Sequence, residues 1–215
     1  DQEAIYELKQ LVVKGDLYAI VSSGKSAFRQ ARWDEAIASY DKAINLLEDN
    51  RELLKQTNTE ENRKKLARIM LQASIIRDNQ DAARHLKEQE FNQAITKLEA
   101  VMATIAASEF KSEPEFEAIR QEAAQSIEQA HTDKLMADKI AYLEENFEEL
   151  FTTHYSGSPP ESLKERTVIF EKQMGSRLLF RLQCVEVGRG RPLQLVMKYS
   201  HDLDTGKWEF YRDSQ

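Results

Sequence analysis

Two stretches of this chain, 58 residues apart, share one pattern of large and small side chains. Residues 31–47 read ARWDEAIASYDKAINLL, and residues 89–105 read QEFNQAITKLEAVMATI. Each has an aromatic residue, an alanine three positions later, and large residues one and four positions after it: Trp33, Ala36, Ile37 and Tyr40, then Phe91, Ala94, Ile95 and Leu98. The aromatic residue wedges two helices at their turn, while the alanine lets their backbones approach and the larger residues fill the ridge between them. The repeat therefore predicts two helical hairpins packed in the same way.

Apolar residues spaced three and four apart extend the helical prediction over most of residues 5–151. Gly15 is the predicted end of the first helix, and the capping-box patterns at 57–60 and 112–115 mark the starts of two others. The predicted helices are 5–15, 16–31, 33–48, 57–77, 79–89, 91–107 and 114–151.

The pattern changes after the Ser/Gly/Pro segment 156–160, which is the clearest linker signal in the chain. Beyond it apolar and polar residues alternate, as in Leu178, Phe180, Leu182 and Cys184. Strands are expected at 166–174, 178–184, 193–199 and 207–212, with turns at 175–176, 188–190 and 202–206. This predicts a four-stranded antiparallel meander with one apolar face, which the helix 114–151 is placed to cover.

The whole is thus an α+β fold: N-terminal helical hairpins, a long connecting helix and a C-terminal four-stranded meander. The predicted domains are 1–110, and 111–215 with the long helix packed on the sheet.

The first hairpin resembles the tetratricopeptide repeat. The residues that carry the resemblance are Gly24, Trp33, Glu35, Ala36, Ile37, Tyr40 and Ala43. The second copy is weaker, since Ala82 replaces the glycine and Val101 the second alanine, and both copies lack the closing proline, with Glu48 and Ala106 in its place. The family repeats about every 34 residues, so the 58-residue spacing suggests that an extra helix, 57–77, is inserted or that the superhelix is broken. The resemblance implies binding of peptides or partner domains.

In the family's register, the outward faces of the first helices carry Val21, Lys25, Phe28 and Arg29, then Asn79, Ala83, Leu86 and Lys87. Lys25 and Arg29 form a cationic i, i+4 pair beside Phe28, where an acidic group or terminal carboxylate of a partner could dock. The alternative is that Phe28 belongs to the core and that both cations are simply solvated. The partner-binding residues predicted on these helices are Lys25, Phe28, Arg29, Leu86 and Lys87.

The last strand is the second predicted partner site. An edge strand offers unpaired backbone groups, and the sequence Lys-Trp-Glu-Phe-Tyr-Arg at 207–212 is rich in residue types that dominate binding interfaces. Tyr211 and Arg212 are therefore candidates for strand addition or for homodimer formation through the sheet edge. The alternative is that Trp208 and Phe210 pack inward and Tyr211 lies against a neighbouring strand.

Composition argues against several other functions. The net charge is −7: residues 1–165 carry −10, and the mildly basic residues 166–215 carry +3. An acidic helical region is unsuited to nucleic acid. The four histidines lie far apart, Cys184 falls on an apolar strand face, and phosphate- or dinucleotide-binding motifs are absent. We therefore expect no metal, no cofactor and no catalysis.

The sequence thus favours a non-enzymatic protein- or peptide-binding scaffold, part of a larger bacterial assembly. The alternative is a ligand-sensing domain with a pocket between the sheet and the long helix. No stretch is apolar enough to span a membrane. The lack of an initial Met and the amphipathic first helix slightly favour a periplasmic or envelope segment over a cytoplasmic one.

Overall fold

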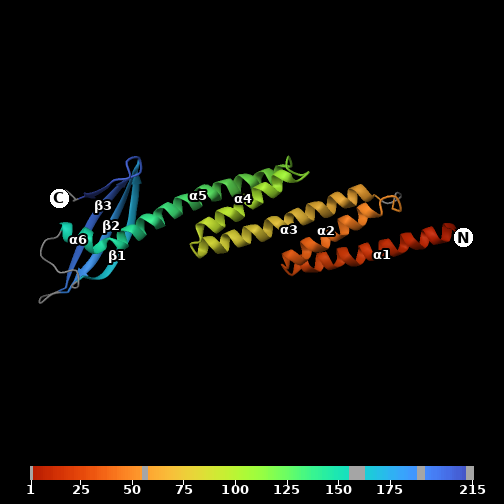
Figure 1. The fold of residues 1–215 in the computed structure, drawn as a ribbon, viewed down its shortest axis with the longest axis horizontal. Coiled ribbons are helices and arrows are strands. Elements are labelled where there is room, and N and C mark those ends of the chain that lie inside the picture. Colours follow the sequence, from red (N-terminus) through yellow and green to blue (C-terminus); the bar gives the residue numbers. More distant parts are fainter. Residues whose placement is uncertain (1, 55–57, 155–162, 188–191, 212–215) are drawn as a thin grey trace. The chain divides into compact units, whose positions relative to one another are not determined.

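The computed structural model describes residues 2–54, 58–154, 163–187 and 192–211, and the chain divides into two compact units, Asp1–His131 and Thr132–Gln215 (Figure 1). Five long helices packed in pairs are followed by a four-stranded antiparallel sheet. The predicted α+β fold class is confirmed.

The helical unit contains α1 (Gln2–Arg29), α2 (Trp33–Asp49), α3 (Thr59–Lys87) and α4 (Phe91–Ala107). Each of these helices packs against the next. As predicted, the repeated alanines Ala36 and Ala94 are completely buried. The repeated aromatic opens the second helix of each hairpin, and the Trp33 ring meets the edge of Phe28 with centroids 5.2 Å apart. The two predicted hairpins are confirmed.

The boundaries of the first and third helices differ from the prediction. α1 continues through Gly15, and a side chain added there would meet no atom within 4 Å. A helical glycine costs only about 1 kcal/mol relative to alanine, so packing of the rest of the helix outweighs it. The separately predicted segments 57–77 and 79–89 are likewise one helix, α3. The 58-residue spacing therefore comes from long first helices of 28 and 29 residues, not from an inserted helix.

Two clusters of buried side chains hold the helical unit together. The first joins α1, α2 and α3 through residues such as Tyr40, Leu47 and Leu66. The second joins α3, α4 and the start of α5 (Pro114–Glu145) through residues such as Leu98 and Phe116. α3 contributes to both, since Leu66 belongs to the first cluster and Leu71 and Ile75 to the second.

The second unit holds the end of α5, α6 (Phe147–His154), β1 (Leu163–Met174), β2 (Arg177–Glu186), β3 (Leu193–Asp202) and β4 (Trp208–Tyr211). The strands pair antiparallel in the order β1-β2-β3-β4, so the predicted meander is confirmed with β4 at an edge. The helix predicted over 114–151 is instead interrupted at Asn146, whose side-chain amide donates to the carbonyl oxygen of Tyr142 at 2.8 Å.

The inner face of the sheet is fully packed. The alternating residues of β2, from Leu178 to Cys184, are buried as predicted. On β3 the alternation holds for Met197 and Tyr199, whereas Leu193 is exposed at the strand end. Leu143, Phe147 and Phe151 of α5 and α6 close the core, and Trp208 and Phe210 of β4 pack against it.

Candidate partner-binding groove

A groove of about 380 Å³ lies between α1 and α3, over α2. Its floor is apolar because the two helices present aliphatic side chains at helical spacing toward α2. Three lysine side chains also line the groove. The lining residues are Lys14, Leu17, Tyr18, Val21 and Lys25 of α1, Leu47 of α2, and Asn62, Lys65, Leu66 and Ile69 of α3.

The lysines differ in their surroundings. Lys65 is 2.5 Å from the carboxylate of Glu61, one turn earlier on α3. Lys14 and Lys25 are exposed and make no ion pair with any residue that the structure describes. Two positive charges at the edge of an apolar floor attract an anionic group and offer its neighbours a place to bury apolar surface.

The groove continues into an uncovered apolar face of α1. Tyr18 at the groove's edge is 78% exposed, and Leu11, two turns earlier on the same face, is 65% exposed. Ile5, Leu8 and Val12 are exposed as well. Exposed apolar side chains that gather on a surface are typical of interaction sites.

Polar contacts hold the part of α1 that precedes Val13, the first residue of this helix that packs against a core cluster. The side-chain amide of Gln10 donates to the carbonyl oxygen of Leu53 at 2.6 Å, and the Tyr6 hydroxyl donates to the same oxygen at 3.3 Å. These contacts attach the helix to the segment after α2. They leave its opposite apolar face uncovered.

The three partner-binding residues predicted on the first hairpin have different surroundings in the structure. Lys25 lines the groove. Phe28 is half-buried against Trp33 and the first core cluster, and Arg29 is exposed. Burial raises the pKa of the Tyr40 hydroxyl, and the positive charge of Arg29 partly opposes that rise.

The residues predicted on the second hairpin lie elsewhere. Leu86 lines a smaller hollow of about 220 Å³ among α3, α4 and α5, together with Asn79 and Ala83. Lys87 is exposed at the last position of α3. These residues are therefore not brought together with Lys25.

Tyr211 is the last residue of β4 and pairs with Lys198 of β3. Arg212 lies outside the described residues. The inward packing of Trp208 and Phe210 agrees with one of the two predicted arrangements for this strand.

Cys184 has the properties of a packing residue. It is 1% exposed inside the sheet core. Burial raises the pKa of its thiol, which disfavours the reactive thiolate.

Sequence reasoning missed Lys14, Tyr18 and Lys65. The signal for the first two was present, because Leu11, Lys14, Tyr18, Val21 and Lys25 follow helical spacing. Ending a helix at Gly15 broke that register. Lys65 comes from α3, and only the packing of α3 beside α1 brings it to the groove.

No helix in the described part of the chain is long and apolar enough to cross a membrane. Comparisons with protein-family models, with curated proteins and with solved structures found no match to this chain.

Proposed function

We propose that this chain is a non-enzymatic binding module whose groove between α1 and α3 receives an acidic, partly apolar segment of another protein. The observation that carries the proposal is the combination of an apolar floor with Lys14 and Lys25, which have no ion-pair partner in the described residues. The tetratricopeptide-like residues at the hairpin turns support a binding role for the stacked helices.

The size of the groove favours a docking segment over a folded domain. About 380 Å³ lies within the roughly 300–1,000 Å³ range of sites that enclose a ligand. An amphipathic helix places apolar anchors in such a groove at i, i+3, i+4 and i+7. The exposed apolar face of α1 lengthens the surface available to it.

Two labelled peptides test the proposal by fluorescence anisotropy. Both carry leucines at i, i+3, i+4 and i+7, and they differ only in having glutamates or lysines at the remaining positions. We expect saturable binding of the acidic peptide and much weaker binding of the basic one, with an affinity that falls as salt rises.

Reversing the lysine charges supplies the matched test. The double variant Lys14→Glu/Lys25→Glu should weaken binding of the acidic peptide by roughly 1–3 kcal/mol, since two favourable contacts become repulsive. The control is Lys42→Glu/Lys111→Glu, which makes the same charge change at exposed positions outside both the groove and α1. Equal binding of both peptides, or equal losses in the two double variants, would contradict the assignment.

A further inference from the structure

The two hairpins turn with the same backbone. In the first turn Ala31 has φ 56°, and the amides of Arg32 and Ala31 donate to the carbonyl oxygens of Ala27 at 2.9 Å and Phe28 at 3.1 Å. In the second turn the residue with positive φ is Gln89, at 60°. This pair of bonds around a left-handed residue is the Schellman helix ending.

The second turn repeats both bonds 58 positions later. The amide of Glu90 donates to the His85 carbonyl at 2.8 Å, and that of Gln89 donates to the Leu86 carbonyl at 3.1 Å. The backbone of the turn therefore forms with either set of side chains.

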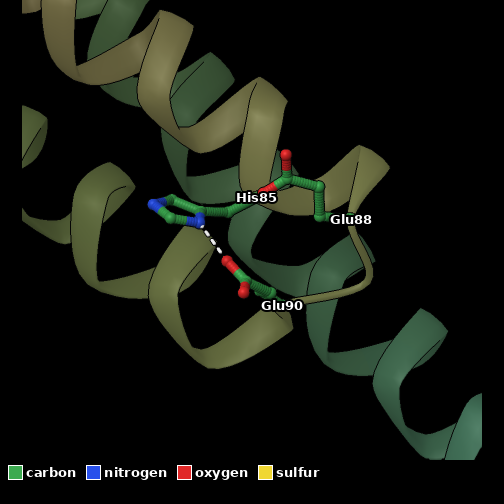
Figure 2. Close-up of side chains that lie close together, drawn as sticks. All are labelled: His85, Glu88 and Glu90. Atoms are coloured by element: carbon green, nitrogen blue, oxygen red, sulfur yellow. Dashed lines mark hydrogen bonds and ion pairs between the residues drawn. The ribbon is translucent and has the colours of Figure 1, made fainter.

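The side chains at matching positions differ in chemistry. The first turn carries Ala27, Gln30 and Arg32, and the second carries His85, Glu88 and Glu90. In the second turn one donor atom from each of the three side chains lies within 4.8 Å of the others. Figure 2 shows Nδ1 of the His85 ring facing the Glu90 carboxylate, 2.5 Å from one of its oxygens, and the Glu88 carboxylate to the side of the His85 side chain.

We propose that His85, Glu88 and Glu90 bind one divalent transition-metal ion, with Zn²⁺ the best match. An imidazole nitrogen with two carboxylates suits zinc better than Ca²⁺ or Mg²⁺, which take oxygen ligands in larger number. Three protein ligands leave a fourth tetrahedral position for water or for a group from another molecule.

The geometry requires only small movements. Zn–N and Zn–O bonds of about 2.0–2.2 Å place tetrahedral donor atoms roughly 3.3–3.6 Å apart. His85 is largely fixed, since its side chain is 12% exposed. Glu88 and Glu90 are exposed, so rotation of their side chains can widen the 2.5 Å separation of His85 and Glu90 and bring Glu88 to the same ion.

Asp81 is a nearby carboxylate that we do not include among the zinc ligands, because it is paired with two cations. Asp81, one turn before His85, is 2.9 Å from Lys97 and 3.1 Å from Arg84. The hydrogen bond from Lys97 is the main reason that the pKa of Asp81 is lowered. Asp81 therefore neutralises two nearby cations and is not needed for the metal.

The test is a calorimetric titration of the chelator-treated full chain with ZnCl₂. We expect saturable 1:1 binding that excess Mg²⁺ does not abolish, and a higher melting temperature with zinc because the ion binds the folded turn. Co²⁺ in place of zinc should give the visible absorption of a four-coordinate site.

The residues of the first turn define a variant that lacks the three proposed zinc ligands but should keep the backbone of the second turn. His85→Ala, Glu88→Gln and Glu90→Arg together give the second turn the residues of the first. Because loss of an outer-shell partner alone costs about 10–100-fold, this variant should bind zinc at least tenfold more weakly with an unchanged circular-dichroism spectrum.

His131→Ala is the control for general histidine binding, since His131 is exposed on α5, and it should bind zinc as the wild type does. No saturable binding, equal affinity in the triple variant, or loss of binding in His131→Ala would each overturn the proposal and leave the His85–Glu90 contact as a hydrogen bond within the turn.

Discussion

Replacing Gly24 with alanine should destabilise the helical unit, whereas the same replacement at Gly15 of the same helix should stabilise it. A Cβ atom at Gly24 would lie 3.1 Å from both Cβ of Ser39 and a ring carbon of Tyr40, and at Gly15 it would meet nothing within 4 Å. Tyr40 is 1% exposed, so its ring has little room to move. The close crossing of α1 and α2 thus depends on a missing side chain.

The magnitudes follow from two opposing effects. Alanine gains about 0.8–1.0 kcal/mol over glycine inside a helix at either position. Overpacking a buried contact costs about 1–3 kcal/mol and applies only at Gly24. The free energy of unfolding should therefore rise by about 0.5–1 kcal/mol in Gly15→Ala and fall by about 0–2 kcal/mol in Gly24→Ala.

The assay must report the helical unit alone, because one stability value is not well defined for a chain of two compact units. The chain has two tryptophans, Trp33 in the helical unit and Trp208 in the sheet unit. In a Trp208→Phe background, urea unfolding followed by fluorescence reports Trp33, whose indole donates to the Gln80 side chain at 2.8 Å.

Equal stabilisation by both alanines would refute the reasoning, because it would mean that α2 shifts to accommodate the added methyl group without cost. A double-mutant cycle gives a sharper version. With Tyr40→Leu the ring contact is gone, so adding Gly24→Ala should cost less than it does in the parent.

Three further substitutions have defined outcomes. Burial lowers the pKa of His201 in the folded protein, so the unfolded chain binds the proton more readily. Stability of the sheet unit should therefore fall below about pH 6.5, by at most about 1.4 kcal/mol per pH unit, and this fall should shrink in His201→Gln, as pH-dependent urea unfolding would show. Tyr199→Phe removes a 3.1 Å hydrogen bond to the Leu150 carbonyl and should cost about 1 kcal/mol, measured from Trp208 fluorescence in a Trp33→Phe background. Ala36→Leu places a large side chain at a completely buried position and should cost about 1–3 kcal/mol, or more, in the Trp33 assay.

The sheet was predictable because its signals are local. Alternation along β2 fixes which residues face the core, and Gly175, with φ 61°, closes the first hairpin at its predicted place. The side chain of Asp202 accepts hydrogen bonds from the amides of Asp204 and Thr205, which explains the last turn.

The helix boundaries and the groove depended on packing that the sequence does not display. Gly15 predicts the end of a helix, yet α1 continues through it. Asp78 falls between the two helices predicted at 57–77 and 79–89, yet it is buried in the middle of α3 and paired with Arg77 at 3.0 Å. Lys25 was identified from its own helix, whereas Lys65 became visible only when α3 was placed beside α1.

The turn cluster was missed for a different reason. The four histidines lie far apart in the sequence, and this spacing predicts no metal site. Glu88 follows His85 by one helical turn, but Glu90 reaches His85 only because the chain reverses at Gln89.

The order of contacts has a kinetic consequence. In the described residues, the elements in extensive backbone contact are all neighbours along the chain, from α1–α2 to β3–β4. Short loops between contacting partners favour rapid folding, and domains generally form from the amino terminus during synthesis. We therefore expect α1 and α2 to gain protease protection in ribosome-stalled chains before the sheet has been translated; protection appearing only in the complete chain would contradict this. A protein built in this way can form the groove between α1 and α3 while its carboxyl-terminal half is still being made.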